Sequence, residues 1–251
     1  MEKYVSSEVK SLFHFIGNDK KAMMDDFYHT CLHRKYQEYS DSSLMLLEDK
    51  NHFSLEDSDI LRRYSGFRFR DINNALRGTW NYEENGHISQ QEKFLHDADR
   101  IRDSIKNNAF SIGNAKVFRG VSLSYFKNYQ VKQLQDLAGL KGCFLYDSAF
   151  VSTSFSEQEC FYQKDNELGI DYNVEIVYLI PEEFCDGIPL FGVSYSPNQK
   201  EYLINSGNLA RVVDVQLEND SAKVSALMIP KQVYDDYYVA NHHRKNKQKE
   251  G

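Results

Sequence analysis

The chain falls into two halves that differ in hydrophobic pattern. Before about residue 108, apolar residues recur at helical spacing, and after it they gather in short runs rich in Val, Ile, Phe and Tyr. Helices followed by strands predict an α+β fold, because a parallel βαβ sheet requires the two kinds of element to alternate. This order is the strongest constraint that the sequence places on the fold.

The first fifty residues are expected to form a helical extension. Apolar stripes predict one helix around residues 9–16 and another around residues 24–32. The chain then becomes polar and acidic between residues 41 and 57, which predicts a joint. The expected division is an N-terminal helical extension at 1–50, a main domain at 51–232 and a polar, basic tail at 233–251.

Three further helices are expected before the strands begin. Ser58 is placed to cap a short helix that ends at Gly66. A second helix should span residues 68–77. A third should start at Ser89, where Glu92 completes a capping box.

The second half predicts one helix and six strands. The helix is expected at residues 124–137. Runs of β-branched and aromatic residues mark the strands. These strands are expected at residues 116–121, 150–155, 174–180, 202–204, 211–217 and 224–229.

Charge and composition exclude several classes of protein. The net charge of −7 argues against a nucleic-acid binder, and basic residues gather only at 242–249, which reads as a solvated tail. No apolar run is long enough for a membrane span or for the core of a signal peptide. We therefore expect a chain that works in a reducing cytosol, delivered by a route that needs no cleaved signal, and we expect a monomer.

The four cysteines give no sign of a metal site or a disulfide framework. Cys31, Cys143, Cys160 and Cys185 form no Cys-x-x-Cys pair, and no histidines stand near them at zinc-binding spacing. We expect four reduced thiols, and no metal.

Three polar features interrupt the apolar strand patterns. Arg119 stands in Val-Phe-Arg-Gly-Val, where a buried guanidinium is costly unless an anion pairs with it. Ser-Thr-Ser occupies residues 152–154 of a strand, and Gln199 precedes Glu201 by two residues. Taken singly, each has a structural explanation: an internal salt bridge, hydroxyls paired across a strand, and a turn.

Taken together and in this order, the three features resemble the Arg, Ser-Thr-Ser and Gln/Glu-x-Glu triad of bacterial mono-ADP-ribosyltransferases. The resemblance is closest to the clostridial Rho-modifying exoenzymes and to the catalytic domains of binary actin-modifying toxins. Arg-Tyr-Ser-Gly at 63–66 and Asp-Ile-Asn-Asn-Ala-Leu-Arg-Gly at 71–78 are similar to a further block of that family. The similarity runs from about residue 55 to residue 217, and the first fifty residues carry no such match.

The resemblance implies an ADP-ribosyltransferase fold, with two packed, mostly antiparallel sheets behind N-terminal helices. It also implies a bacterial toxin or effector that acts in a host cell. The reaction would transfer ADP-ribose from NAD, the co-substrate, to a host protein, either a small GTPase-like protein or another cytosolic protein. Two alternatives stay open: an NAD glycohydrolase, and an inactive fold used only for binding.

Arginine side chains suit the phosphates of NAD, because a planar fork of donors matches phosphate oxygens. Arg119 fits this role. Asn73 and Arg77 are four residues apart and project from one helical face, so they are expected to hold the phosphates from the other side. Ser152 and Thr153 complete the expected NAD contacts on the strand.

Glu201 is the expected catalytic carboxylate. Cleavage of the N-glycosidic bond leaves positive charge on the ribose, and a carboxylate beside the 2′-hydroxyl stabilises that charge. Ser152 is expected to hydrogen-bond to Glu201 and orient it. Phe161 is the expected partner of the nicotinamide ring, preferred over Phe155 because Phe155 continues the strand.

The acceptor is expected to be neutral. In extended geometry Gln199 and Glu201 point to the same face, so Gln199 should reach the acceptor while Glu201 serves NAD. In the resembling family, Gln at this place goes with asparagine acceptors, and an amide can both donate to and accept from a neutral group. Asparagine is therefore expected first, with glutamine, threonine and serine behind it, and Tyr195 is expected to contact the target.

Overall fold

The computed structural model describes residues 18–50, 52–80, 88–160 and 172–235. Three sequence-based expectations lie outside these residues: the helix at 9–16, the position of Phe161 and the solvated run at 242–249.

The helices before residue 108 agree with the apolar stripes, with changes at their boundaries. The expected helix at 24–32 is confirmed as α2, Asn18–Leu32. The expected joint at 41–57 is wrong, because it holds α3, Asp41–Glu48, whose N-cap Ser40 accepts a hydrogen bond from the Ser43 N–H. The remaining helices are α4 at Leu55–Arg63, α5 at Phe69–Arg77 and α7 at Ile88–Asn108.

The expected caps of the later helices are corrected. Ser54, and not Ser58, caps α4, and its Oγ accepts the Asp57 N–H at 3.0 Å. Gly66 does not end the helix, because the chain continues through a π-helical turn, Tyr64–Arg68, into α5. A Cβ at Gly66 would lie 3.4 Å from the ring of Tyr195, so this ring packs directly against Gly66. The helix expected to start at Ser89 is α7, which starts one residue earlier, at Ile88.

All six expected strands are present, and two short ones were missed. The missed strands are β2, Phe144–Asp147, and β5, Gly187–Pro189. The expected strands are β1 at Ala115–Val121, β3 at Val151–Ser154, β4 at Val174–Ile180, β6 at Glu201–Ile204, β7 at Asn208–Leu217 and β8 at Ala222–Ile229. The remaining short elements are α8 at Glu157–Cys160, the 3₁₀ turn η5 at Pro197–Gln199 and α9 at Lys231–Tyr234.

The expected helix at 124–137 is wrong. Two 3₁₀ helices occupy this stretch, η3 at Leu123–Tyr129 and η4 at Leu134–Leu140. Gln130 ends η3 in the left-handed conformation, with φ of 60°, so a continuous α-helix cannot form.

The strands form one hydrogen-bonded order of eight, β2-β7-β8-β4-β1-β3-β6-β5. β4 and β8 pair parallel, and the other described pairs are antiparallel. A single register pair, Phe118 with Ser154, joins β1 to β3, so the two expected sheets are linked at this point. The α+β fold class is confirmed.

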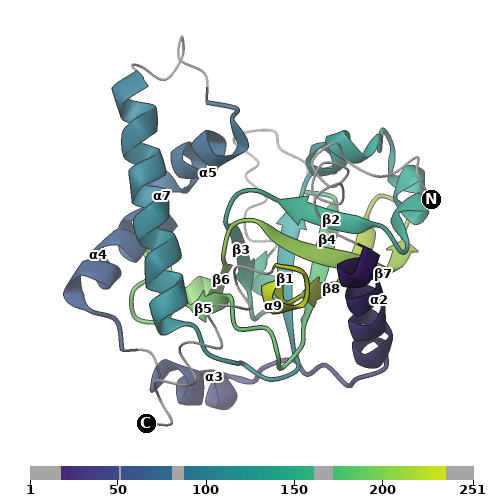
Figure 1. Ribbon diagram of the computed structural model, residues 1–251, viewed down its shortest axis with the longest axis horizontal. Coiled ribbons are helices and arrows are strands. Elements are labelled where there is room, and N and C mark those ends of the chain that lie inside the picture. The colour runs from purple at the N-terminus through teal and green to yellow at the C-terminus, as the bar shows by residue number, and fades with distance from the viewer. Residues whose placement is uncertain (1–17, 51, 81–87, 161–171, 236–251) are drawn as a thin grey trace.

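Helices flank the sheet on two sides (Figure 1). α4, α5 and α7 gather beside β5 and β6, where Ile60, Ile72 and Ile101 share a core with Leu203. On the other side α2 packs through Met24 and Cys31 against β7, β8 and α9. Helices therefore pack against the sheet on both sides. The middle strands of the sheet are left available to line a site.

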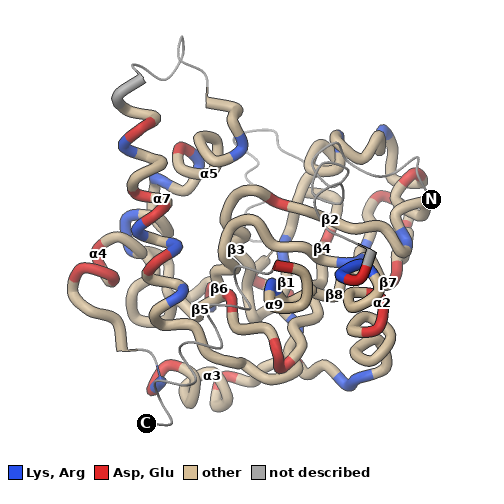
Figure 2. Tube along the Cα trace, viewed as in Figure 1, with Lys and Arg blue, Asp and Glu red and all other residues tan. Residues whose placement is uncertain are grey.

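Charged residues are mixed in sign along the surface helices. Figure 2 shows Lys and Arg interspersed with Asp and Glu along α4, α5 and α7. Among the described residues, no helix combines the length and apolarity needed to cross a membrane.

Candidate active site

A cavity of about 620 Å³ lies between α5, the strands β1 and β3, and the start of β6. Seven residues singled out in the sequence line it, although they come from four separate parts of the chain. They are Asn73, Arg77, Arg119, Ser152, Thr153, Gln199 and Glu201.

Glu201 is a buried carboxyl at the first position of β6, only 5% exposed. The Ser152 hydroxyl, from β3, donates to its Oε1 at 2.5 Å, and the Ser194 hydroxyl donates to its Oε2 at 3.3 Å. Burial raises the pKa of Glu201 to about 7, and the two hydroxyl hydrogen bonds oppose that rise. The site thus holds a carboxyl whose charge changes near neutral pH.

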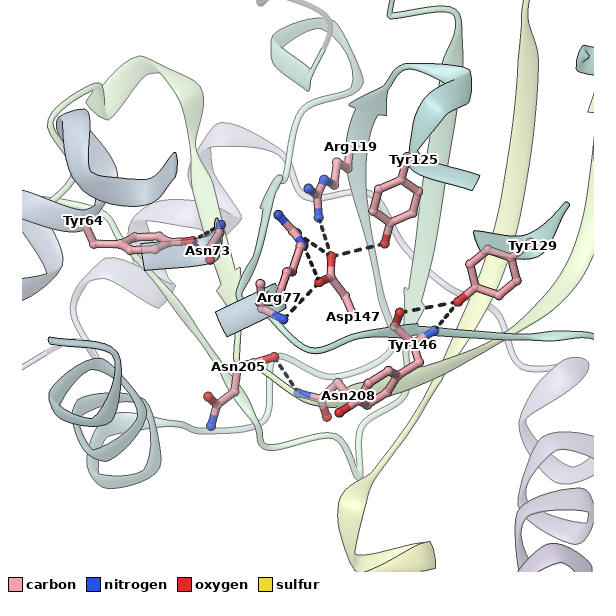
Figure 3. A network of polar contacts seen from close by, with 11 residues as sticks. Tyr64, Asn73, Arg77, Arg119, Tyr125, Tyr129, Tyr146, Asp147, Asn205 and Asn208 are labelled. Atoms are coloured by element: carbon pink, nitrogen blue, oxygen red, sulfur yellow. Dashed lines mark hydrogen bonds and ion pairs between the residues drawn. The ribbon is translucent and has the colours of Figure 1, made fainter. Parts of the chain in front are cut away.

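A cluster of charged residues also lines the cavity, and Figure 3 shows Arg77 and Arg119 directed toward Asp147. Arg77, at the end of α5, donates two hydrogen bonds to the Asp147 carboxylate, from Nε to Oδ1 at 3.1 Å and from Nη2 to Oδ2 at 2.8 Å. Arg119 approaches the same carboxylate with Nη1 at 3.8 Å from Oδ2, and the Tyr125 hydroxyl donates to Oδ2 at 3.4 Å. The internal salt bridge considered for Arg119 therefore exists, but Arg77 holds the carboxylate more closely.

The donors of Arg119 are not used up by this pairing. Its Nη1 is buried and makes no hydrogen bond within the described part of the chain. The Tyr125 ring lies 5.3 Å from the Arg119 guanidinium carbon, which favours the cation in this place. A buried charged donor without a hydrogen bond, on the wall of a cavity, suits an anionic ligand, and the phosphates of NAD have this chemistry.

Asn73 is buried beside the arginines, 7% exposed. Its Nδ2 donates to the Tyr64 hydroxyl at 3.2 Å (Figure 3). Asn73 and Arg77 project toward the same cavity, as their spacing on one helix requires.

Gln199 lines the cavity, but with a backbone conformation that the sequence did not indicate. The expected extended geometry is wrong, because Gln199 ends the 3₁₀ turn η5 and Lys200 follows in the left-handed conformation, with φ of 47°. The Ser154 hydroxyl donates to the Gln199 carbonyl at 2.7 Å and fixes the turn beside β3. Gln199 and Glu201 line the same cavity by this turn and not by strand alternation.

Two other expected residues have different surroundings. The Thr153 hydroxyl donates to the backbone carbonyl of Tyr202 at 2.7 Å, so it serves the pairing of β3 with β6. Tyr195 is 64% exposed and lies outside the described lining of the cavity. Its backbone N–H donates to the Ser65 hydroxyl at 2.8 Å. Phe155 is buried in the core, as expected for a residue that continues the strand.

The sequence reasoning missed Asp147 and Ser194. Asp147 precedes the Ser-Thr-Ser strand by five residues, and Ser194 precedes Glu201 by seven. Both touch residues that were singled out, but neither stands at a spacing that suggests this. The described residues contain no group of three or more His, Cys, Asp or Glu side chains placed to hold a metal.

The family model for the ADP-ribosyltransferase exoenzymes matches residues 33–235. The chain belongs to the ADP-ribosyltransferase exoenzyme family. Its expected enzyme class, an NAD-dependent ADP-ribosyltransferase, is confirmed, and so is the resemblance seen in the motifs. No curated protein matches the chain.

Solved structures of bacterial ADP-ribosyltransferases share the fold at low sequence identity. The C3 exoenzyme of Clostridium limosum aligns with a TM-score of 0.61 and 14% identity, over 79% of this chain and 99% of that one. C3stau2 from S. aureus, solved with NAD, gives a TM-score of 0.61 and 14% identity, over 79% and 100%. The Vis toxin of Vibrio splendidus, solved with agmatine, gives 0.55 and 13%, over 82% and 93%.

Proposed function

We propose that this exoenzyme transfers ADP-ribose from NAD to a neutral side chain of a host protein, with asparagine as the first candidate. The observation that supports this proposal most directly is the environment of Glu201, a buried carboxyl that accepts hydrogen bonds from two hydroxyls. The same cavity also contains Arg77, Arg119 and Gln199. The solved relative C3stau2 contains NAD, which supports NAD as the ligand of this cavity. NAD supplies the ADP-ribosyl group and a nicotinamide leaving group.

In this proposal each side chain has a distinct task. Arg119 and Arg77 bind the phosphates, and Asn73 lies beside them in the same wall. Glu201, when ionised, stabilises the positive charge that develops on the ribose, and Ser152 orients it. Phe161, from outside the described residues, would pack against nicotinamide.

Gln199 is proposed to contact the acceptor, and Tyr195 the target protein. An amide pairs with a neutral amide or hydroxyl, whereas a guanidinium acceptor would favour a carboxylate at this position. The exposed ring of Tyr195 stands four residues before Gln199 in the same loop. Residues 51–232 would form the catalytic domain of a toxin that acts in a host cell.

Two measurements test the acceptor. Gln199→Ala should abolish modification of protein in a host lysate supplied with labelled NAD, while nicotinamide release in the absence of target stays within about twofold of wild type. Peptide mapping of the labelled band should find modified asparagine. ADP-ribosyl-arginine on the target would contradict the neutral acceptor, and nicotinamide release with no labelled protein would favour a glycohydrolase.

The phosphate assignment is tested by NAD titration. Arg119→Ala and Arg77→Ala should each weaken NAD binding by at least about tenfold, because a hydrogen bond to a charged group contributes about 1.5–3 kcal/mol. Arg100→Ala is a suitable control, since Arg100 pairs with Glu56 away from the described lining of the cavity. Unchanged affinity in both site variants would contradict the assignment.

A further inference from the structure

The second oxygen of the Glu201 carboxyl is held by a residue that no motif predicts. Ser152 donates to Oε1, and Ser194 donates to Oε2 from the loop of residues 191–200, called here the 191–200 loop. Ser194 is buried, 8% exposed. Each oxygen therefore has its own hydroxyl, one from a strand of the sheet and one from a loop.

The direction of the Ser194 hydrogen bond follows from its partners. Its Oγ accepts the Ser196 N–H at 3.2 Å, and Glu201 in its ionised form can only accept. The one hydroxyl proton of Ser194 is thus committed to Glu201. The backbone is fixed as well, because the Ser194 N–H donates to the Leu190 carbonyl at 2.8 Å and the Leu190 N–H donates to the Glu201 carbonyl at 2.9 Å.

Neighbouring residues of this loop face opposite environments. Ser194 is buried against Glu201, while the next residue, Tyr195, is 64% exposed and rests against Gly66. The Tyr195 N–H is bound to Ser65 in the π-helical turn. A displacement of the Tyr195 backbone would therefore move the Ser194 hydroxyl relative to the carboxyl.

We propose that Ser194 is a positioning residue for Glu201, which holds the second carboxyl oxygen and links the 191–200 loop to the catalytic carboxylate. The inference deepens the proposed function and rests on it. Through this link, contact of a target with the outer face of the loop would reach the group that acts on NAD. The Ser152 hydroxyl, which comes from strand β3, provides no such direct link between the loop and the carboxyl.

The test compares Ser194→Ala with Ser194→Thr, which keeps a hydroxyl, and with Ser196→Ala as a matched control. Ser196 lies in the same loop, and within the described part of the chain its side chain makes no hydrogen bond, so only its backbone N–H serves the network. Carbon-13 NMR of labelled glutamate side chains follows the titration of Glu201, which is assigned through the signal that Glu201→Gln removes. The same proteins are then assayed for nicotinamide release across pH.

Ser194→Ala should raise the pKa of Glu201 by about 0.5–1 unit, the size expected for loss of one hydrogen bond to the ionised form. The acidic limb of the nicotinamide-release profile should move up by the same amount, with Ser194→Thr close to wild type and Ser196→Ala unchanged. An unchanged Glu201 titration in Ser194→Ala, or an equal shift in Ser196→Ala, overturns the proposal. If the wild-type chain releases no nicotinamide, the proposed function fails, and the NMR titration still decides whether Ser194 holds Glu201.

Discussion

Arg77 and Asp147, 70 residues apart in the chain, form a two-bond ion pair on the wall of the cavity that also contains Glu201. The Asp147 carboxylate is 7% exposed, and Arg119 approaches it from a second side. In this state one internal carboxylate pairs with the two guanidiniums that we assign to the phosphates of NAD, and it balances only one of their two positive charges. Asp147 therefore stabilises the free protein and competes for the donors that the ligand needs.

Replacing Asp147 with Asn should separate these two effects. Asp147→Asn keeps the shape but removes the negative charge that pairs with the two arginines, so the free energy of unfolding should fall by about 1–3 kcal/mol. Added NAD should then raise the melting temperature by more in the variant than in wild type, because its phosphates replace the lost charge. Thermal unfolding with and without NAD measures both quantities.

Asp214→Asn is the control for this prediction. Asp214 pairs with Lys141 on the surface, where both side chains are well exposed, so its loss should change stability by less than about 1 kcal/mol. An Asp147→Asn variant that behaves like the control would contradict a stabilising role for the buried pair.

Glu201 should make stability depend on pH in the direction opposite to a salt-bridged acid. Its pKa is raised from 4.5 to about 7 in the folded state, because burial disfavours the charge. Between these values the folded state binds more protons than the unfolded state, so stability falls as pH rises through this window. Glu201→Gln removes this dependence.

Urea unfolding at about pH 5 and about pH 8 measures the effect. Relative to wild type, Glu201→Gln should gain on the order of 2–3 kcal/mol between these conditions. Gln199→Ala, which changes no ionisable group, should follow the wild-type curve. A constant difference between Glu201→Gln and wild type would mean that Glu201 titrates normally.

Nicotinamide release should rise with pH through about 7, because the ionised form of Glu201 acts on NAD.

The sequence predicted the elements that are determined by local residue patterns. It missed the elements that depend on contacts between distant parts of the chain. The β-branched run that became β4 is buried almost throughout and was placed correctly. β5 has three residues and contains Pro189, so it exists because β6 pairs with it. Gly66 was taken as a helix end because the sequence does not show the Tyr195 ring that packs against it.

The same limit applies to the site. Arg119, Ser152 and Glu201 were found through the order of their motifs, and the fold places all three on one cavity. Asp147 and Ser194 stand in ordinary surroundings in the sequence, and only the pairing of distant elements puts them on Arg77 and Glu201. Polar residues that contact the expected site residues cannot be predicted from the sequence when no fixed spacing relates the two sets of residues.

Tyr202, beside Glu201, should tolerate loss of its hydroxyl. The side chain is fully buried, and its hydroxyl has no hydrogen-bond partner within the described part of the chain. Removing a buried polar group that has no partner costs no hydrogen bond, so Tyr202→Phe should be neutral or stabilising by up to about 1 kcal/mol. Denaturant unfolding measures this difference.

Tyr129→Phe provides the contrasting case. The Tyr129 hydroxyl accepts the Tyr146 N–H at 2.8 Å (Figure 3). Loss of the hydroxyl removes this partly buried hydrogen bond and should cost about 1–3 kcal/mol. Equal destabilisation by the two substitutions would show that the Tyr202 hydroxyl has a partner after all.

The helix α2 should contribute to stability without contributing to the chemistry. The guanidinium carbon of Arg211, in β7, lies 4.1 Å from the Tyr28 ring centroid and 5.4 Å from the Phe144 ring centroid. Arg211 also pairs with Asp25 of α2 at 2.5 Å. Tyr28→Ala removes a buried ring and a cation–π contact, and should cost about 2–4 kcal/mol in the free energy of unfolding. Arg211→Lys keeps the charge but loses the planar stacking, and should cost about 1 kcal/mol.

Activity separates a structural role of α2 from a role in target recognition. No residue of α2 is found in the described lining of the cavity, so nicotinamide release by Tyr28→Ala, assayed well below its melting temperature, should equal that of wild type. Modification of protein in a host lysate should also be unchanged if α2 only supports β7 and β8. A variant that keeps nicotinamide release but loses protein modification would instead place α2 at the surface that meets the target.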